Sequence, residues 1–319
     1  MKLIDENELE HLLTYDKLIP QIKDAFSQEY NIPLRNHHQY PNPKETSEST
    51  ILLMPAWDEG KYLGVKIVTL SPNNKNYDLP SIQGLYVLFD LPTGTPIAMI
   101  DGKKLTTKRT AATSALASGY LSNPESKCLL MIGNGALAPE LIKAHISVRP
   151  IKEVYLWGRN IEKSLQLIDN LDYPQISFSA IETLDEKIAE VDMISCATLS
   201  QHPLILGKAL KPGQHLDMVG SFKPDMREMD DETIIKADIY VDTMEGSTRE
   251  SGDLVIPLKN GILKTEDIKA ELSELVKGLK NGRTSADQIT CFKSVGHALE
   301  DLAAASLAYE LSIHDDLNE

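Results

Sequence analysis

The spacing of hydrophobic residues changes along the chain, and each change predicts a different kind of element. Residues 3–30 place apolar side chains at helical spacing and predict two helices, the first capped by Asp5. Between residues 49 and 101 the spacing shortens to β-rich runs separated by Gly, Pro and Asn, which predicts a mostly antiparallel sheet. The Ala-rich stretch 105–121 then predicts a helix.

The second half of the chain alternates between short apolar runs and helical stretches. The runs are CLLMIG, EVYLWG, ISFSA, DMISCAT, HLDMVG and DIYVD, and the chain closes on a long amphipathic helix. Such alternation predicts a parallel sheet flanked by helices. We therefore expect an α/β protein, with a Rossmann-type parallel-sheet domain over residues 122–295 and an α+β domain over 1–121 and 296–319.

Composition narrows the class of protein and of partner. A chain of 319 residues favours two domains, and its 42% hydrophobic content is ordinary for a globular protein. The net charge of −15 argues against a nucleic-acid or anionic-membrane partner, because both need a basic face. Cys128, Cys196 and Cys291 have no disulfide or zinc spacing, and the first residues have no secretion signal, so we expect a cytoplasmic protein.

A dinucleotide fingerprint follows the first strand of the second half. Residues 133–138, GNGALA, match G-x-G-x-x-A directly after a strand and at the start of a helix. Gly133 allows the tight turn, Gly135 lets a pyrophosphate approach the backbone, and Ala138 lets the helix pack on its strand. The alternative is an ordinary strand-to-helix turn. The predicted cofactor contacts here are Gly133, Asn134, Gly135, Ala136 and Leu137.

The end of the next strand bears on the choice of cofactor. It runs into Gly158, Arg159 and Asn160, without the acidic residue that accepts hydrogen bonds from a ribose 2′-hydroxyl. An arginine there suits a 2′-phosphate, so NADP(H) is preferred and NAD(H) remains possible. The alternative is that Arg159 is a solvated surface charge.

Three basic residues of the first half are candidates for binding an anion. Lys66 lies in the apolar run YLGVKIVTL, where alternation puts it on the face of Gly64 and Val68; it either enters a pocket or is an edge-strand lysine. Arg109 lies near the start of the Ala-rich helix, where the helix dipole disfavours a cation, so an anionic partner is expected. Arg35 is a third candidate or an ordinary surface charge.

Over its whole length the chain resembles the ornithine cyclodeaminase/μ-crystallin family. The resemblance rests on long stretches in the same order: LGVKIVTL, LPSIQGLYVLFDLPTGTPIAMIDGKKLTTKRTAATSALASGYL, GNGALA, ISCATLSQHPLI, LKPGQHLDMVGSFKPDMREM and FKSVGHALEDLAAA. Members of that family are homodimers joined through the N-terminal domain. The resemblance therefore implies a homodimer whose α+β domain both binds substrate and forms the dimer.

The resemblance also implies roles for individual residues. Lys66, Arg109 and Arg35 would hold the carboxylate of a small anionic imino acid, an interaction that charge-assisted hydrogen bonds serve well. Ser81 and Gly296 would lie beside the substrate. The cofactor would contact Thr110 through a phosphate, and Ala197 and Thr198 beside the nicotinamide.

One departure from the family pattern bears on the reaction. Cyclodeaminases and related alanine dehydrogenases carry an acidic residue just before the segment that is here PDMREM, and this chain has Ser221 and Phe222 in its place. Asp225, after the proline, is interpreted as a loop or cap residue. Deamination of an acyclic amino acid is thereby put in doubt, and reduction of a preformed C=N bond is favoured.

The resulting hypothesis is NAD(P)H-dependent reduction of a cyclic ketimine carboxylate, Δ1-pyrroline-2-carboxylate to L-proline or its six-membered homologue to L-pipecolate. Lys66, Arg109 and Ser81 are the proposed catalytic residues, with Ser81 or a water it holds handling the proton and His297 as a weaker candidate. Three alternatives stay open: an ornithine cyclodeaminase or amino-acid dehydrogenase, a non-catalytic NADP-dependent binding protein, and synthesis of an N-substituted amino acid.

Overall fold

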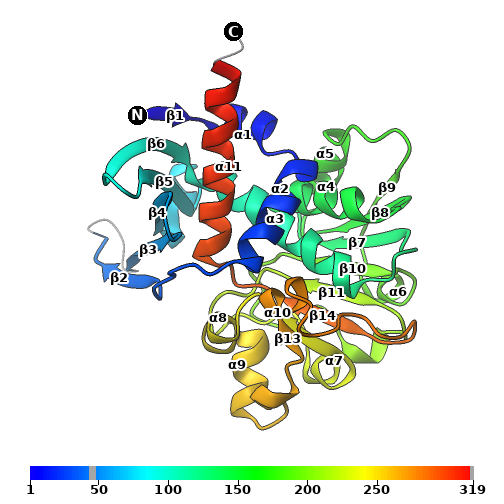
Figure 1. Ribbon diagram of the computed structural model, residues 1–319. Helices are drawn as coiled ribbons and strands as arrows, with labels where there is room; N and C mark the ends of the chain where they lie inside the picture. The colour runs from blue at the N-terminus through cyan, green and yellow to red at the C-terminus, as the bar shows by residue number, and fades with distance from the viewer. Residues whose placement is uncertain (43–47, 317–319) are drawn as a thin grey trace. The chain divides into compact units, whose positions relative to one another are not determined.

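Two β-sheets organise the residues that the computed structural model describes, which are 1–42 and 48–316 (Figure 1). Each sheet belongs to its own unit, Met1–Thr110 with Ala298–Glu319 in the first and Ala111–His297 in the second. The border falls inside helix α3 (Gly102–Leu121), earlier than the expected 121/122. The helix runs through this border unbroken, so the change in hydrophobic spacing marks the end of the helix and not the point where packing changes.

The first unit is built on a six-stranded sheet, within the described residues, in the order β1-β6-β5-β4-β3-β2. Neighbours from β2 to β6 are antiparallel, as predicted, and β1 joins the edge parallel to β6. Helix α11, red in Figure 1, packs across β3, β4 and β5 and against α2, so helices cover one face of the sheet. The elements are β1 (Lys2–Ile4), α1 (Glu6–Leu12), α2 (Tyr15–Ser27), β2 (Asn36–Tyr40), β3 (Ser49–Trp57), β4 (Tyr62–Leu70), the 3-10 helix η1 (Pro72–Tyr77), β5 (Ile82–Asp90), β6 (Thr95–Asp101), the start of α3, and α11 (Ala298–Asp316).

The second unit is an eight-stranded parallel sheet, within the described residues, in the order β13-β12-β14-β11-β10-β7-β8-β9. The strand order reverses between β7 and β10, which makes that junction the switch point of an open α/β sheet. The predicted fold class is confirmed. The elements are β7 (Cys128–Ile132), α4 (Ala138–Val148), β8 (Glu153–Trp157), α5 (Ile161–Asp169), β9 (Ser177–Ile181), α6 (Asp185–Ile188), β10 (Met193–Cys196), η2 (Gly207–Ala209), β11 (His215–Met218), α7 (Asp231–Lys236), β12 (Asp238–Val241), α8 (Met244–Glu250), α9 (Gly252–Lys259), η3 (Thr265–Asp267), β13 (Ala270–Glu271), α10 (Leu272–Val276) and β14 (Thr290–Lys293).

The N-terminus departs from the predicted pair of helices. Asp5 does cap α1, because its carboxylate accepts hydrogen bonds from the N–H groups of Asn7 and Glu8, both at 2.9 Å. The residues before it are extended, however, since Lys2–Ile4 pairs with residues 98–100 of β6. Local spacing cannot reveal a partner so far along the chain. No helix among the described residues is long and apolar enough to cross a membrane.

Buried polar groups connect the central strands of the second unit to helix α4. Asp217 of β11 accepts a hydrogen bond from Ser195 Oγ at 2.7 Å and lies 3.0 Å from Nε2 of His145, which α4 supplies. Burial alone would raise the pKa of Asp217, but the bonds to His145 and Ser195 lower it overall. These contacts fix the helix that follows the glycine fingerprint against its sheet.

Candidate active site

The glycine fingerprint forms a tight turn at the switch point of the parallel sheet. Gly133 has φ 112°, a conformation that side chains other than glycine rarely adopt. A Cβ placed on it would lie 2.5 Å from the carbonyl oxygen of Ala197, at the end of β10. The structure thus brings Gly133 and Ala197, both predicted cofactor contacts, directly together, at the edge where open α/β sheets bind their ligands.

The rest of the turn leaves room for a phosphate. Gly135 and Ala136 are exposed, and a Cβ added to Gly135 would meet nothing within 4 Å. Helix α4 begins at Ala138, and no side chain caps its first N–H groups; Leu137 occupies the N-cap position. Free N–H groups at a helix N-terminus bind phosphate oxygens, so the turn fits the pyrophosphate of a dinucleotide.

Asn134 ties the glycine turn to the end of β8. Its Nδ2 donates to the carbonyl of Asn160 at 2.9 Å and to Ser164 Oγ at 3.0 Å. A Cβ on Gly158 would lie 2.2 Å from that Nδ2, so any other residue at this position would displace the Asn134 amide. The side chain of Asn160 caps α5. Arg159 between them is exposed and forms no ion pair within the described residues.

The loop after β10 is held by a residue that the sequence analysis did not single out. Glu228 is fully buried and accepts hydrogen bonds from the backbone N–H and the hydroxyl of Thr198, each at 2.7 Å. Burial raises the pKa of Glu228, while the nearby ammonium of Lys293 acts in the opposite direction. The sequence signal was slight, an acid flanked at short distance by the apolar Met226 and Met229.

The residue that replaces the family's acid does not present its side chain as a free group. Ser221 is fully buried, and its Oγ donates to the carbonyl of Met226 at 2.9 Å and lies 2.9 Å from Ser251 Oγ. Asp225 is exposed in the same loop and accepts from Gln201 Nε2 at 3.1 Å, which agrees with its interpretation as a loop residue.

In the first unit, Lys66 and Arg109 meet over a pair of carboxylates on α11. Lys66 is 2% exposed on the interior strand β4, so it is not an edge lysine. Its Nζ donates to Asp301 at 2.8 Å, and Nε of Arg109 lies 2.8 Å from the same carboxylate. Arg109 also pairs with Glu300. The anionic partner expected for Arg109 is therefore present within the chain, and neither acid was among the candidate residues.

This cationic cluster, Lys66 and Arg109 with Arg35, is partly neutralised by its acidic partners. Burial lowers the pKa of Lys66 to about 8, with Arg109 and Arg35 acting in the same direction and Asp301 against them. The two carboxylates of Glu300 and Asp301 thus lie among the cations of this cluster.

Tyr86 is a further buried polar side chain on the Lys66 face of the sheet. It stands opposite Lys66 in the register of β4 and β5, and it is fully buried. Its hydroxyl has no hydrogen-bond partner among the described residues, and it packs where a Cβ on Gly64 would lie only 1.9 Å away. Glycine at position 64 is therefore what admits the tyrosine ring beside Lys66.

The remaining predicted residues occupy definite places in one unit or the other. Ser81 is half-buried before β5, and its carbonyl accepts from the N–H of Ser71 at 2.8 Å. Thr110 is 6% exposed within α3. Gly296 has φ 84°, and its N–H donates to Asp242 Oδ2 at 2.8 Å, while His297 beside it is half-buried. Their functional roles stay predictions.

A parallel sheet with a glycine turn at its switch point, joined to an α+β unit that buries a cationic cluster, defines a Rossmann-type nucleotide-binding protein with an added domain. The chain belongs to the ornithine cyclodeaminase/mu-crystallin family, whose sequence profile matches residues 2–315. The resemblance inferred from the sequence is thus confirmed.

Three similar proteins extend this result. The Delta(1)-pyrroline-2-carboxylate reductase of Colwellia psychrerythraea is 38% identical over 313 residues, 97% of this chain and 99% of that protein. The Thermococcus litoralis enzyme of the same name, solved with NADH and L-proline, is 34% identical with a TM-score of 0.93 over 99% of this chain and 98% of that one. An archaeal alanine dehydrogenase dimer with bound NAD is 27% identical with a TM-score of 0.89 over 99% and 97%.

Proposed function

We propose that this chain is an NAD(P)H-dependent reductase of a cyclic ketimine carboxylate, converting Δ1-pyrroline-2-carboxylate to L-proline or the six-membered Δ1-piperideine-2-carboxylate to L-pipecolate. The observation that carries the redox part is the position of Gly133, whose positive φ and closeness to Ala197 form an open turn at the sheet's switch point. The substrate class is supported by full-length relatives named as reductases of this imine, at 34% and 38% identity.

The residues of the proposed reaction fall into a cofactor set and a substrate set. The residues proposed to hold the dinucleotide are Gly133, Asn134, Gly135, Ala136, Leu137, Gly158, Arg159, Asn160, Ala197 and Thr198, with Thr110 toward a phosphate. When bound, the nicotinamide supplies the hydride that reduces the C=N carbon. Lys66 and Arg109, with Arg35, bind and orient the substrate carboxylate, and orientation of this kind supplies much of the rate. Ser81 and Gly296 complete the proposed substrate contacts, with Ser81 or its water handling the proton.

Steady-state assays test the reaction and separate it from its alternatives. We expect oxidation of NADPH or NADH with the five- and six-membered cyclic imino acids, and no ammonia release from ornithine or alanine in the reverse direction. Arg109→Leu is expected to raise KM and lower kcat, while Arg109→Lys, which keeps the charge, retains more activity. Turnover of ornithine or alanine in place of the imines would contradict the proposal, and so would unchanged kinetics in Arg109→Leu.

The cofactor proposal includes a preference for NADP(H) over NAD(H), and this preference depends on Arg159. This side chain is exposed at the end of β8, so replacing it leaves the core intact. Arg159→Gln is expected to raise KM for NADPH about tenfold and to leave KM for NADH nearly unchanged, because one charge-assisted contact to a 2′-phosphate is lost. Equal effects on both cofactors would remove Arg159 from the proposed 2′-phosphate site.

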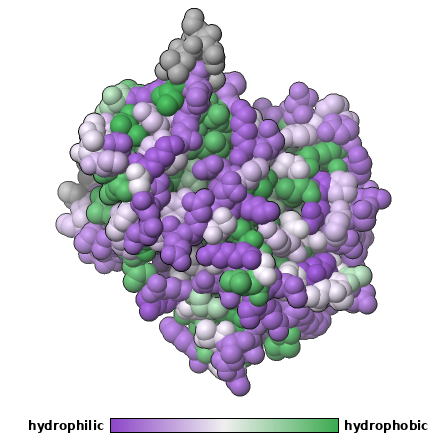
Figure 2. All heavy atoms as spheres, viewed as in Figure 1, coloured by the Kyte–Doolittle hydropathy of each residue, from purple (hydrophilic) through white to green (hydrophobic). Residues whose placement is uncertain are grey.

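A homodimer is also part of the proposal, through the sheet of the first unit. The face of this sheet opposite Lys66 carries apolar side chains in register across neighbouring strands, including Val65, Val87 and Met99, and all three are only half-buried. Hydrophobic atoms also reach the surface over β3–β6, at the left of Figure 2. An exposed apolar sheet face of this kind is typical of an interface.

The dimer is tested by the mass of the protein in solution. We expect light scattering to give twice the mass of the chain, and Val87→Lys to give one chain mass because a charge cannot be buried in an apolar interface. Leu165→Lys, at an exposed position of α5, serves as the matched control. A wild-type protein with the mass of one chain would exclude the dimer.

A cytoplasmic location completes the proposal, supported by the free thiols of all three cysteines.

A further inference from the structure

Both carboxylate oxygens of Glu228 accept hydrogen bonds, and the donors come from two different loops. Oε1 accepts from the N–H and Oγ1 of Thr198, each at 2.7 Å, and from Sγ of Cys196 at 3.1 Å. Oε2 accepts from the N–H of Gly220 at 2.8 Å and that of Ser221 at 3.0 Å. One carboxylate therefore ties the loop after β10 to the loop after β11.

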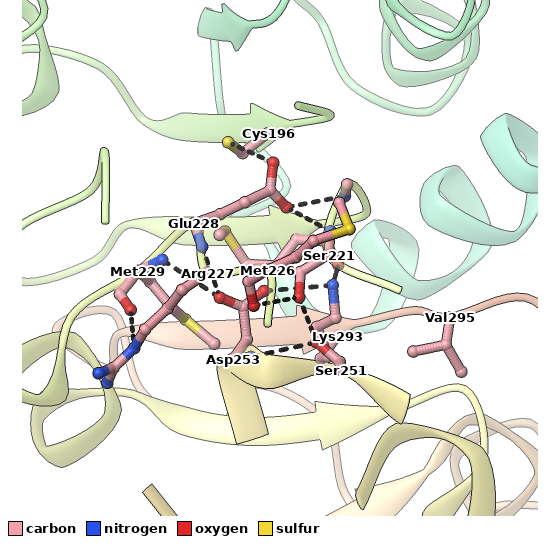
Figure 3. A network of polar contacts seen from close by, with 12 residues as sticks. Cys196, Ser221, Met226, Arg227, Glu228, Met229, Ser251, Asp253, Lys293 and Val295 are labelled. Atoms are coloured by element: carbon pink, nitrogen blue, oxygen red, sulfur yellow. Dashed lines mark hydrogen bonds and ion pairs between the residues drawn. The ribbon is translucent and has the colours of Figure 1, made fainter. Parts of the chain in front are cut away.

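The backbone of Glu228 is fixed from the other side by a buried ion pair (Figure 3). The N–H of Glu228 donates to Asp253 Oδ1 at 2.7 Å, and Asp253 Oδ2 lies 3.3 Å from Nζ of Lys293. That ammonium also donates to the carbonyl of Met218, the last residue of β11, at 3.0 Å. Because every one of these side chains is buried, Glu228 cannot move without breaking bonds that water would not replace.

The two loops that Glu228 joins lie at the switch point of the sheet. Ala197 is the residue whose carbonyl meets the glycine turn at Gly133, and it directly precedes Thr198. The second loop touches the first, since a Cβ on Gly220 would lie 2.2 Å from both N and O of Thr198. Ligands of open α/β sheets bind outside these strand ends, so the shape of the two loops is part of the nucleotide site.

We propose that Glu228 is a positioning residue, which holds the Ala197–Thr198 and Gly220–Ser221 loops in the shape that seats the nicotinamide end of the cofactor. This inference rests on the proposed function. A carboxylate is suited to the task because it offers an acceptor at each end, whereas a glutamine would turn an NH2 group toward the donors of one loop. The glycine turn at residues 133–137, which is proposed to bind the phosphates, receives none of the hydrogen bonds of Glu228 described above.

Binding of a whole and a truncated cofactor separates this role from a general loss of structure. We compare wild type and Glu228→Gln for their affinity toward NADH and toward ADP-ribose, which lacks the nicotinamide ring. The affinity for ADP-ribose is expected to stay within about twofold, while NADH binds about tenfold more weakly and kcat with Δ1-pyrroline-2-carboxylate falls by about tenfold or more. Should Glu228→Gln fail to fold, Glu228→Asp keeps the charge but reaches one loop less well, and the same divergence is expected in smaller measure.

A nearby acid provides the control for stability. Asp230 caps α7 by accepting from the N–H of Thr233 at 2.8 Å, and alanine offers no acceptor there, so Asp230→Ala is expected to lower stability without changing the ratio of NADH to ADP-ribose affinity. Equal weakening of both ligands in Glu228→Gln, or no weakening of either, would overturn the positioning role alone. A wild-type protein that binds neither NADH nor NADPH would overturn the proposed function and this inference with it.

Discussion

Lys66 is expected to lose its proton within an accessible pH range, and the protein is then expected to lose affinity for a carboxylate ligand. Burial, reinforced by Arg109, lowers the pKa of this lysine from 10.5 to about 8. That shift corresponds to about 3 kcal/mol against the charged form. The charge proposed to bind a carboxylate is therefore present below pH 8 and is lost as the pH rises through that value, so that about one lysine in ten stays protonated at pH 9.

Pyrrole-2-carboxylate suits the measurement, because this planar ring acid keeps a constant charge across the range of interest. We expect its Kd for the NADH-loaded protein, measured by calorimetry, to be level below pH 7 and to rise about tenfold per pH unit above pH 8. Lys66→Arg keeps its charge at every pH used, because the guanidinium does not titrate there, and is expected to give a level profile.

The pH dependence of Kd is compared between wild type and Lys66→Arg to identify the titrating group. Lys66→Met, which has no charge to lose, is expected to bind weakly at every pH and to show no rise either. If wild type and Lys66→Arg weakened in parallel above pH 8, the titrating group would be another one, and Lys66 would not bind the carboxylate through its charge.

Three further predictions concern stability and cofactor binding. Asp301→Asn is expected to lower the free energy of unfolding in urea by about 3 kcal/mol, because it breaks the buried ion pairs of Asp301 with Lys66 and Arg109; no loss would show that these pairs do not stabilise the fold. Gly133→Ala is expected to abolish measurable NADH binding in fluorescence titrations, whereas Gly119→Ala, whose new methyl meets nothing within 4 Å, leaves it unchanged. Burial lowers the pKa of His215 to about 3, so stability is expected to fall below pH 6.5, by about 2 kcal/mol at pH 5, in acid-titrated thermal unfolding; a His215→Gln variant with the same slope would contradict this.

Local patterns in the sequence were sufficient for the class of both units and for the nucleotide turn. Period-two alternation in residues 49–101 and strand–helix alternation after residue 124 depend on which face of each element is buried, a property that neighbouring residues report directly. The turn at Gly133 was visible for the same reason, since the strand, the glycines and the helix are contiguous. The cap of α1 by Asp5 is a further local feature that the structure confirms.

The acidic partners of Lys66 and Arg109, by contrast, could not be predicted from local patterns in the sequence. Lys66 and Arg109 were identified as buried cations in need of an anion, but Glu300 is separated from Arg109 by 191 positions, and Asp301 from Lys66 by 235. The acids lie in a helix otherwise rich in alanine, and only packing of α11 on the sheet shows that they face the cations.

What the sequence by itself determined are the two kinds of sheet, the glycine turn and the family. Only the tertiary structure shows that the buried cations form ion pairs with carboxylates of the same chain, and that Glu228 joins two loops at the switch point. The physical reason is that periodicity records the burial of each side chain, whereas a hydrogen bond or ion pair depends on a second group whose distance along the chain is unrelated to its distance in space.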